Sequence, residues 1–162
     1  MITRPTTDAL IADCCQELTE EILPALTDDT LRLRLIMTET VLRNAAVRAA
    51  HEIAWMREET AGLLAYAAAV AGVAAVAAVA DRDGGGEPLR AALAAAEACP
   101  ADSLHLGDVA RRYERAGEAF TQALAAAQRA GAADLVARAR ELLRDRIATE
   151  KQVMASYAVV GR

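Results

Sequence analysis

The chain has 162 residues, of which 54% are hydrophobic and only 3% aromatic, and its formal net charge is -5. This length suits one domain, and the hydrophobic content excludes an intrinsically disordered chain. The apolar residues are mainly Ala, Leu and Val, which favours an all-α fold: a helical bundle of about five to six helices with a long central helix. We expect residues 1–162 to form a single helical domain.

The charge pattern argues against nucleic-acid binding. The N-terminal portion is acidic, and no block of Lys or Arg provides the basic surface that a phosphate backbone requires. The first residues lack the apolar segment of a signal peptide, so we expect a cytoplasmic protein. Cys14, Cys15 and Cys99 form neither a disulfide framework nor a metal-ligand spacing. We interpret Cys14 and Cys15 as buried small hydrophobic residues of the first helix and not as reactive thiols, because the sequence shows no basic neighbour that would lower the thiol pKa.

The first predicted helix begins after Pro5. Thr6, Thr7 and Asp8 are suited to capping its N-terminus, and apolar residues then recur at three- and four-residue steps. Pro24 has no backbone donor and its ring clashes with the preceding turn. The helix is therefore expected to end or kink just before Pro24.

A second start signal, Thr27-Asp28-Asp29, precedes the longest helical segment of the chain. Apolar residues cover most of its circumference, so it requires cover on two sides, by other helices or by a second subunit. The main stripe that we expect to be buried is Leu31, Leu35, Thr38, Leu42, Ala45, Ala49, Ile53 and Met56. A narrow face formed by Arg32, Glu39 and Arg43 is expected to meet water.

The most varied polar surface of this helix lies in its second half. Arg48, His51, Glu52, Trp55 and Glu59 fall within one sector at helical spacing. One interpretation is a solvated face, in which Arg48 pairs with Glu52 and Trp55 packs on a neighbouring helix. The other is a patch for a ligand or partner, in which a cation, an imidazole and an indole bind an anionic or planar group.

Residues 61–80 contain no charged side chain and are rich in Ala, with Val at every third position in the second half. Twenty residues are long enough to span a bilayer, but Ala contributes almost nothing to insertion and the flanking charges show no cationic bias, which argues against a membrane span. We expect a buried packing helix in which Gly62 and Gly72 permit close approach of another helix. An unbroken helix over 31–80 would be about 75 Å long, so we predict a bend or break near residues 60–62.

A flexible, glycine-rich linker is predicted at residues 81–87, because three consecutive glycines cannot hold a helix. A short helix over residues 89–98 follows, then a helix from Asp108 that ends at Gly131, and a last helix from residue 134 to about 157. The residues of the last helix that we expect to be buried are Val136, Ala139, Leu143, Ile147, Met154 and Tyr157.

No motif in the sequence supplies catalytic chemistry. His51 and His105 lack the Glu-x-x-His spacing of a di-iron bundle, and His51-Glu52 lacks the second His of a zinc-protease helix. The three glycines at 84–86 lack the Lys-Ser/Thr of a phosphate-binding loop. We therefore expect no enzyme, no metal site and no cofactor.

Two segments, RPTTDALIADCCQELTEEILPAL at residues 4–26 and VRAAHEIAWMREE at residues 47–59, resemble small uncharacterised helical proteins of high-GC bacteria. Those proteins are encoded beside aminoglycoside-phosphotransferase-like kinases and acyl-CoA dehydrogenases. The resemblance covers about the first sixty residues, with a looser match in ARELLRDRIATEK, and it includes no catalytic motif. It implies an accessory or regulatory partner of a kinase-like or dehydrogenase-like protein. The Ala-rich run and the triple glycine depart from the pattern.

Two functional hypotheses follow from these observations. The first is a non-enzymatic helical accessory or partner protein of acyl metabolism that is homo-oligomeric, with a dimer favoured. The second is a helical protein that binds a small acyl or anionic ligand at the patch around Arg48, His51, Glu52 and Trp55. Neither hypothesis includes nucleic acid or a membrane as a partner.

Overall fold

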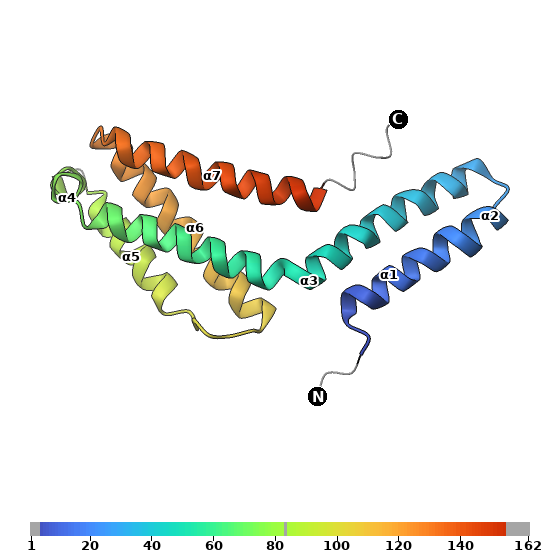
Figure 1. The fold of residues 1–162 in the computed structure, drawn as a ribbon. Helices are drawn as coiled ribbons and strands as arrows, with labels where there is room; N and C mark the ends of the chain where they lie inside the picture. Colours follow the sequence, from blue (N-terminus) through green and yellow to red (C-terminus); the bar gives the residue numbers. More distant parts are fainter. Residues whose placement is uncertain (1–3, 83, 155–162) are drawn as a thin grey trace. The chain divides into compact units, whose positions relative to one another are not determined.

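The computed structural model describes residues 4–82 and 84–154, with the backbone alone for residues 152–154. All regular structure in these residues is helical (Figure 1), which confirms the all-α class and the long central helix. The elements in chain order are α1 (Thr7–Glu17), the π-helical turn η1 (Leu18–Ile22), α2 (Leu23–Ala25), α3 (Asp29–Ala71), α4 (Ala74–Arg82), α5 (Gly86–Glu97), α6 (Leu106–Arg129) and α7 (Ala133–Met154).

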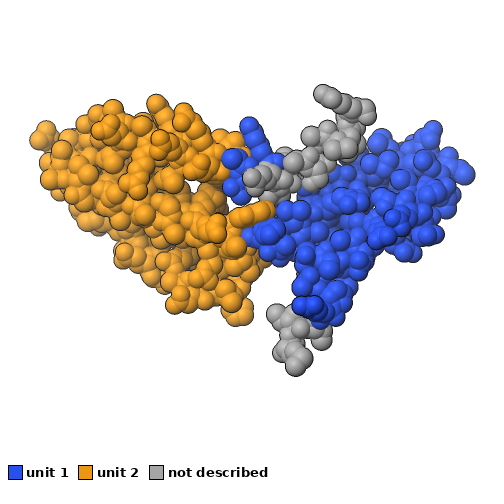
Figure 2. Space-filling view, in the orientation of Figure 1, with its two compact units in different colours: residues 1–52, 148–162 blue, residues 53–147 orange. Residues whose placement is uncertain are grey.

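The chain divides into two compact units (Figure 2). Unit 1 comprises residues 1–52 and 148–162, and unit 2 comprises residues 53–147. Both boundaries fall inside helices, the first inside α3 and the second inside α7. Neither Gly nor Pro marks either boundary, although a polar run at residues 149–152 lies close to the second.

Unit 1 contains a helical hairpin, in which α1, η1 and α2 run in one direction and the first part of α3 returns beside them (Figure 1). Pro24 lies in α2, directly after η1. The helix expected to end or kink just before Pro24 does not end there. It continues through α2 to Ala25, and the π-helical turn η1 shifts the carbonyl groups that the proline ring would otherwise meet. The predicted start of α3 is confirmed, because Asp28 Oδ1 accepts from the backbone N–H of Thr30 at 2.8 Å and of Leu31 at 3.1 Å.

The long central helix is broken at a different place from the one predicted. α3 runs without interruption through residues 60–62, so the break expected there is wrong. The helix ends at Ala71, and α4 begins at Ala74 with its axis bent by 78° from that of α3. Gly72 lies at this bend, where a residue that disfavours helix by about 1 kcal/mol relative to Ala interrupts the Ala-rich run.

The Ala-rich segment packs in the core only in part. Val70 and Val76 are buried, whereas Val73 lies in the turn between α3 and α4 and is exposed. The close helix approach expected at Gly62 is not seen, because a Cβ atom there would lie 3.5 Å from Leu142 Cδ2, which is an ordinary contact distance.

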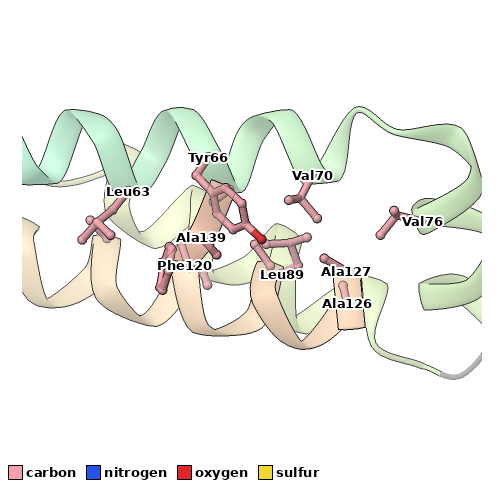
Figure 3. Packing of buried hydrophobic residues seen from close by; sticks show 14 of the residues in the cluster. Leu63, Tyr66, Val70, Val76, Leu89, Phe120, Ala126, Ala127 and Ala139 are labelled. Carbon is pink, nitrogen blue, oxygen red and sulfur yellow. The ribbon is translucent and has the colours of Figure 1, made fainter. Parts of the chain in front are cut away.

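The hydrophobic core lies in unit 2, where the last part of α3, α4, α5, α6 and the first part of α7 meet (Figure 3). Tyr66 and Phe120 pack against each other, with ring centroids 5.1 Å apart and planes tilted by 49°. The other buried members of the cluster are mostly small: Leu63, Ala67, Val70, Val76, Ala80, Leu89, Ala92, Ala116, Ala119, Ala123, Ala126, Ala127 and Ala139. Small side chains allow helix backbones to approach closely, so Ala is used here as the main packing residue.

Glycines with positive φ end two of the helices. Gly84 (φ 72°) follows α4 and Gly131 (φ 66°) follows α6. At the end of α6 the N–H of Ala132 donates to the carbonyl of Ala127 at 3.0 Å, which closes a Schellman cap. The end predicted at Gly131 is therefore confirmed.

The helices on either side of the predicted linker extend into it, so fewer residues separate them than the sequence predicted. α4 continues to Arg82 and α5 begins at Gly86, so the described non-helical part of the predicted linker at 81–87 is residues 84 and 85.

The burial expected along α7 holds only in part. Ala139 is buried, but Ile147 is exposed, so its predicted burial is wrong. Tyr157 and the side chain of Met154 lie outside the described residues.

Candidate functional site

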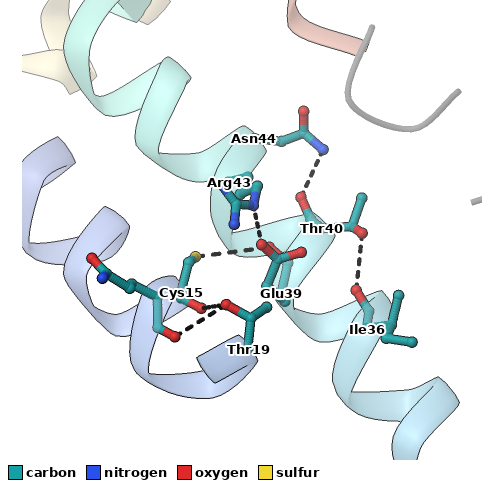
Figure 4. A network of polar contacts seen from close by, with 8 residues as sticks. Cys15, Thr19, Ile36, Glu39, Thr40, Arg43 and Asn44 are labelled. Atoms are coloured by element: carbon teal, nitrogen blue, oxygen red, sulfur yellow. Dashed lines mark hydrogen bonds and ion pairs between the residues drawn. The ribbon is translucent and has the colours of Figure 1, made fainter. Parts of the chain in front are cut away.

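The two helical arms of the unit 1 hairpin contact each other through polar and small side chains (Figure 4). Cys15 is fully buried, and its thiol lies 3.9 Å from the backbone carbonyl of Glu39. The carboxylate of Glu39 pairs with Arg43, one turn later in α3. Thr40 and Asn44 are also buried, and each donates to a carbonyl one turn back in α3. Glu39 is only 8% exposed, so the prediction that it faces water is wrong.

Because polar residues occupy the inside of this hairpin, apolar residues remain on the outside. Leu33, Met37 and Val41 lie at four-residue steps on α3 and are 53%, 58% and 54% exposed; we call these three residues the α3 stripe. Four further large apolar side chains of unit 1 are exposed: Leu10, Ile22, Leu31 and Val47. The predicted burial of Leu31 is therefore wrong.

The five residues of the predicted ligand or partner patch all lie on α3, but they are divided between the two units. Arg48, His51 and Glu52 belong to unit 1, and Trp55 and Glu59 belong to unit 2. Arg48 and Glu52 form an ion pair in which Arg48 is well exposed, and such pairs contribute little to stability. His51 is exposed and Trp55 half-buried, and each makes further interactions.

Glu59 lies in a polar cluster that joins three helices of unit 2. The hydroxyl of Tyr113 on α6 donates to Glu59 Oε2 at 3.0 Å, and Arg146 Nε on α7 lies 3.5 Å from Oε1. The guanidinium of Arg146 also lies 5.8 Å from the centroid of the Tyr113 ring. Oε1 is buried and no donor among the described residues forms a hydrogen bond to it, so its contact with Arg146 is an ion pair without a hydrogen bond. This cluster gives Glu59 a structural role in addition to its place in the predicted patch.

Unit 2 also contains a cavity of about 260 Å³ between α3, α6 and the connection that precedes α6. Its lining residues are Arg57, Thr60, Ala61 and Leu64 from α3, Pro100, Ala101 and Asp102 from the connection, and Val109 and Arg112 from α6. The lining therefore combines two guanidinium groups, one carboxylate and one hydroxyl with an apolar wall. Such a mixture is typical of sites for small molecules with one polar end.

Arg112 is the residue of this cavity that has a buried donor without an acceptor among the described residues. Its Nε is buried, and no acceptor among the described residues meets it. No ion pair within the described part of the chain involves Arg57 or Arg112. A buried donor without an acceptor costs about 1–3 kcal/mol, so an anion bound here would remove an existing penalty.

Sequence reasoning missed this cavity, although Arg57 lies within the segment that carries the predicted patch. Arg57 and Arg112 lie on different helices, and no spacing in the sequence connects them. In the sequence, each of these arginines lies next to apolar positions of an amphipathic helix. Many arginines without a binding role do the same, so this pattern does not identify a site.

A search for metal sites and membrane spans, and comparison with known proteins, identify no further candidate site residues among those described. Among the described residues, no three His, Cys, Asp or Glu side chains come together as metal ligands would. Within the same part of the chain, no single helix is long and apolar enough to cross a membrane, although the bent pair α3 and α4 passes that test jointly. The sequence matches no protein-family model, and neither the curated proteins nor the solved structures include a match to it.

Proposed function

We propose that the chain is a non-enzymatic helical accessory protein that acts by association, and that unit 1 is the surface through which two copies form a homodimer. The observation that carries this proposal is the exposed α3 stripe of Leu33, Met37 and Val41 on a hairpin with little apolar burial of its own. The cytoplasmic location expected from the sequence forms part of the same proposal.

A hairpin of two helices cannot enclose a hydrophobic core. In unit 1, Cys15 is the one apolar side chain among the described residues that is classed with the core, and the core cluster itself belongs to unit 2. Full burial of a Leu, Met or Val side chain contributes about 1.5–3 kcal/mol, so covering the half-exposed α3 stripe would contribute several kcal/mol. Two hairpins that pair along this stripe would give a four-helix bundle, with each stripe meeting its own copy across a two-fold axis.

The charges favour a second copy as the occupant of this surface. The segment 7–25 contains five acidic residues and no Lys or Arg: Asp8, Asp13, Glu17, Glu20 and Glu21. The unit 1 part of α3 carries four arginines and three acidic residues, Asp29, Glu39 and Glu52. Since Arg43 pairs with Glu39 and Arg48 with Glu52, Arg32 and Arg34 are the arginines of this segment without an ion pair among the described residues. In a two-fold pairing, the acidic helix of one copy lies beside the arginine-bearing helix of the other, and the same contact occurs twice.

The oligomeric state of Met37→Glu tests this proposal. The wild-type chain of 17.1 kDa is expected to sediment as a dimer at micromolar concentration, and Met37→Glu to sediment as a monomer, because it places two like charges at the centre of the contact. Leu104→Glu is the matched control, since Leu104 is an exposed apolar residue of unit 2 and gains the same charge. It is expected to remain dimeric.

Two results would contradict the proposal. One is a wild-type chain that is monomeric at every concentration measured. The other is a dimer that Met37→Glu leaves intact. A monomeric wild type that forms a complex with a kinase-like or dehydrogenase-like protein, as the resemblance implies, would assign the surface to that partner and overturn the homodimer.

A further inference from the structure

We propose that the cavity of unit 2 lined by Arg57, Thr60 and Arg112 is a binding site for a small organic monoanion, namely a carboxylate with a short aliphatic chain. The proposal rests on residues of unit 2 alone. It is therefore independent of the homodimer proposed for unit 1.

The cationic side of the cavity is built to receive an oxyanion. The guanidinium of Arg112 contributes a buried Nε–H that meets no acceptor among the described residues, and Arg57 brings a second guanidinium from α3. Guanidinium groups bind carboxylates through two parallel hydrogen bonds, which fits a planar anion held between two helices. Thr60, which is buried, adds a hydroxyl to the same lining.

A comparison within unit 2 separates Arg112 from an arginine with a structural role. Arg146 lies against Glu59 and over the ring of Tyr113, so its charge is met by the protein. Among the described residues Arg112 forms no ion pair, although its Nε is buried and Asp102 lines the same cavity. An arginine kept for stability would be expected to have the kind of environment that Arg146 has.

The charge balance of the cavity selects a monoanion. Arg57 and Arg112 supply two positive charges and Asp102 supplies one negative charge, which leaves one positive charge uncompensated. A carboxylate neutralises this charge. A phosphate group, whose charge at neutral pH is close to two, would leave an excess negative charge beside Asp102.

The remaining wall and the size of the cavity define the rest of the ligand. Ala61, Leu64, Pro100, Ala101 and Val109 are apolar and suit an aliphatic chain. A volume of about 260 Å³ corresponds to roughly nine water-sized groups at ~30 Å³ each, which is close to the size of hexanoate.

Calorimetric titration of the full-length chain with hexanoate tests the site. We expect one hexanoate to bind per chain, and hexanamide, which has the same size but no charge, to bind at least tenfold more weakly. Arg112→Gln is expected to weaken hexanoate binding by roughly ten- to a hundredfold, because it removes a charge-assisted bidentate contact. Arg57→Gln is expected to weaken it less, since the exposed Arg57 remains partly solvated.

Arg111→Gln is the matched control. Arg111 is the neighbour of Arg112 on α6, it is exposed and paired with Asp108, and it does not line the cavity. Its replacement removes the same charge and is expected to leave hexanoate binding unchanged. If Arg112→Gln unfolds the chain, as judged by circular dichroism, the comparison between Arg57→Gln and Arg111→Gln decides.

Three outcomes would overturn the proposal. If Arg111→Gln weakens hexanoate binding as much as Arg112→Gln or Arg57→Gln does, hexanoate is attracted by the general charge of the protein and not bound at a defined site. Equal binding of hexanamide and hexanoate would exclude recognition of the anion. Binding of inorganic phosphate that hexanoate does not displace would exclude a carboxylate ligand. Sedimentation of each variant shows whether the dimer is retained, so failure of this proposal is distinguishable from failure of the one for unit 1.

Discussion

Two tyrosines of unit 2 differ in what their hydroxyl groups meet. Tyr113 donates to Glu59, whereas the hydroxyl of Tyr66 is fully buried and has no hydrogen-bond partner among the described residues. Burial raises the pKa of Tyr66 above its ordinary value of about 10, because a phenolate would be poorly solvated in the core. Tyr66 therefore costs stability in a way that Tyr113 does not.

We predict that Tyr66→Phe removes part of the loss of stability at alkaline pH. Above pH 10 the unfolded chain ionises Tyr66 while the folded chain keeps it neutral. The folded state then binds more protons, and the free energy of unfolding falls as pH rises through the unfolded pKa. Tyr66→Phe has no hydroxyl to ionise and therefore lacks this loss of stability. At pH 8 the variant should be as stable as wild type or up to about 1–2 kcal/mol more stable, because it has no unpaired hydroxyl in the core.

Urea unfolding at pH 8 and pH 10.5 measures this effect. The matched control is Tyr113→Phe, which leaves Glu59 Oε2 without its donor and is expected to lose about 1–2 kcal/mol at pH 8. Wild type and Tyr66→Phe that lose the same stability between the two pH values would contradict the prediction.

At the scale of the helix, a glycine inside α6 and the glycine that follows its end are expected to respond oppositely to replacement by alanine. Gly117→Ala is expected to stabilise the chain by about 0.5–1 kcal/mol, because a Cβ atom there meets nothing within 4 Å and Gly weakens a helix interior. Gly131→Ala is expected to destabilise it by about 1–2 kcal/mol, because its φ of 66° disfavours any side chain. Thermal unfolding of both variants measures the two shifts, and shifts of the same sign would count against this assignment.

Helix ends could be predicted from the sequence where a local side chain determines them. Asp28 caps α3 through its own carboxylate, and Gly131 ends α6 through its own conformation. The break in the central helix was misplaced because it depends on packing. Residues 60–62 have modest helix propensity, but the adjoining Leu63 and Tyr66 are buried in the core, and their burial outweighs a local cost of about 1 kcal/mol.

The direction in which α3 faces could not be predicted, although its helical period could. A period shows which residues share a face, but both faces of this helix carry apolar residues, so the period does not decide which face is covered. Glu39 is buried because Arg43 neutralises it, while Met37 remains exposed. The cavity was missed for a related reason: Arg57 and Arg112 come together only through the packing of α3 and α6.

At the scale of the whole molecule, the two units differ in how much apolar surface each buries. The core cluster belongs to unit 2, and unit 1 has a polar interior with the α3 stripe exposed. Since local stability follows buried apolar contacts, we predict that dilute protein opens unit 1 at lower urea concentration than unit 2.

Cysteine labelling measures this opening. The burial predicted for Cys14 is wrong: Cys14 is exposed, and it is expected to react with a thiol reagent in native buffer. Cys15 is fully buried, and burial raises the pKa of its thiol, so it is expected to react only once the hairpin opens. In a Cys14→Ser/Cys99→Ser double variant, whose one remaining thiol is Cys15, labelling of Cys15 should precede the change in fluorescence of Trp55, which belongs to unit 2. Labelling that coincides with the Trp55 transition would contradict separate opening.

The same measurement bears on the homodimer. Association stabilises only the unit that takes part in it, so a higher protein concentration should protect Cys15 to higher urea concentration and leave the Trp55 transition in place. Protection of Cys15 that does not depend on concentration would speak against pairing through unit 1.

Both boundaries between the units lie within helices, and this restricts how the chain can be cut or extended. The bonds between residues 52 and 53 and between 147 and 148 are part of α3 and α7, so neither unit can be excised at a loop. Residues 98–105 form a loop, but part of it lines the cavity. Gly131, between α6 and α7, is exposed and belongs to neither boundary, but Ala130 and Ala132 beside it pack against the core, so an insertion there would disturb the cap of α6.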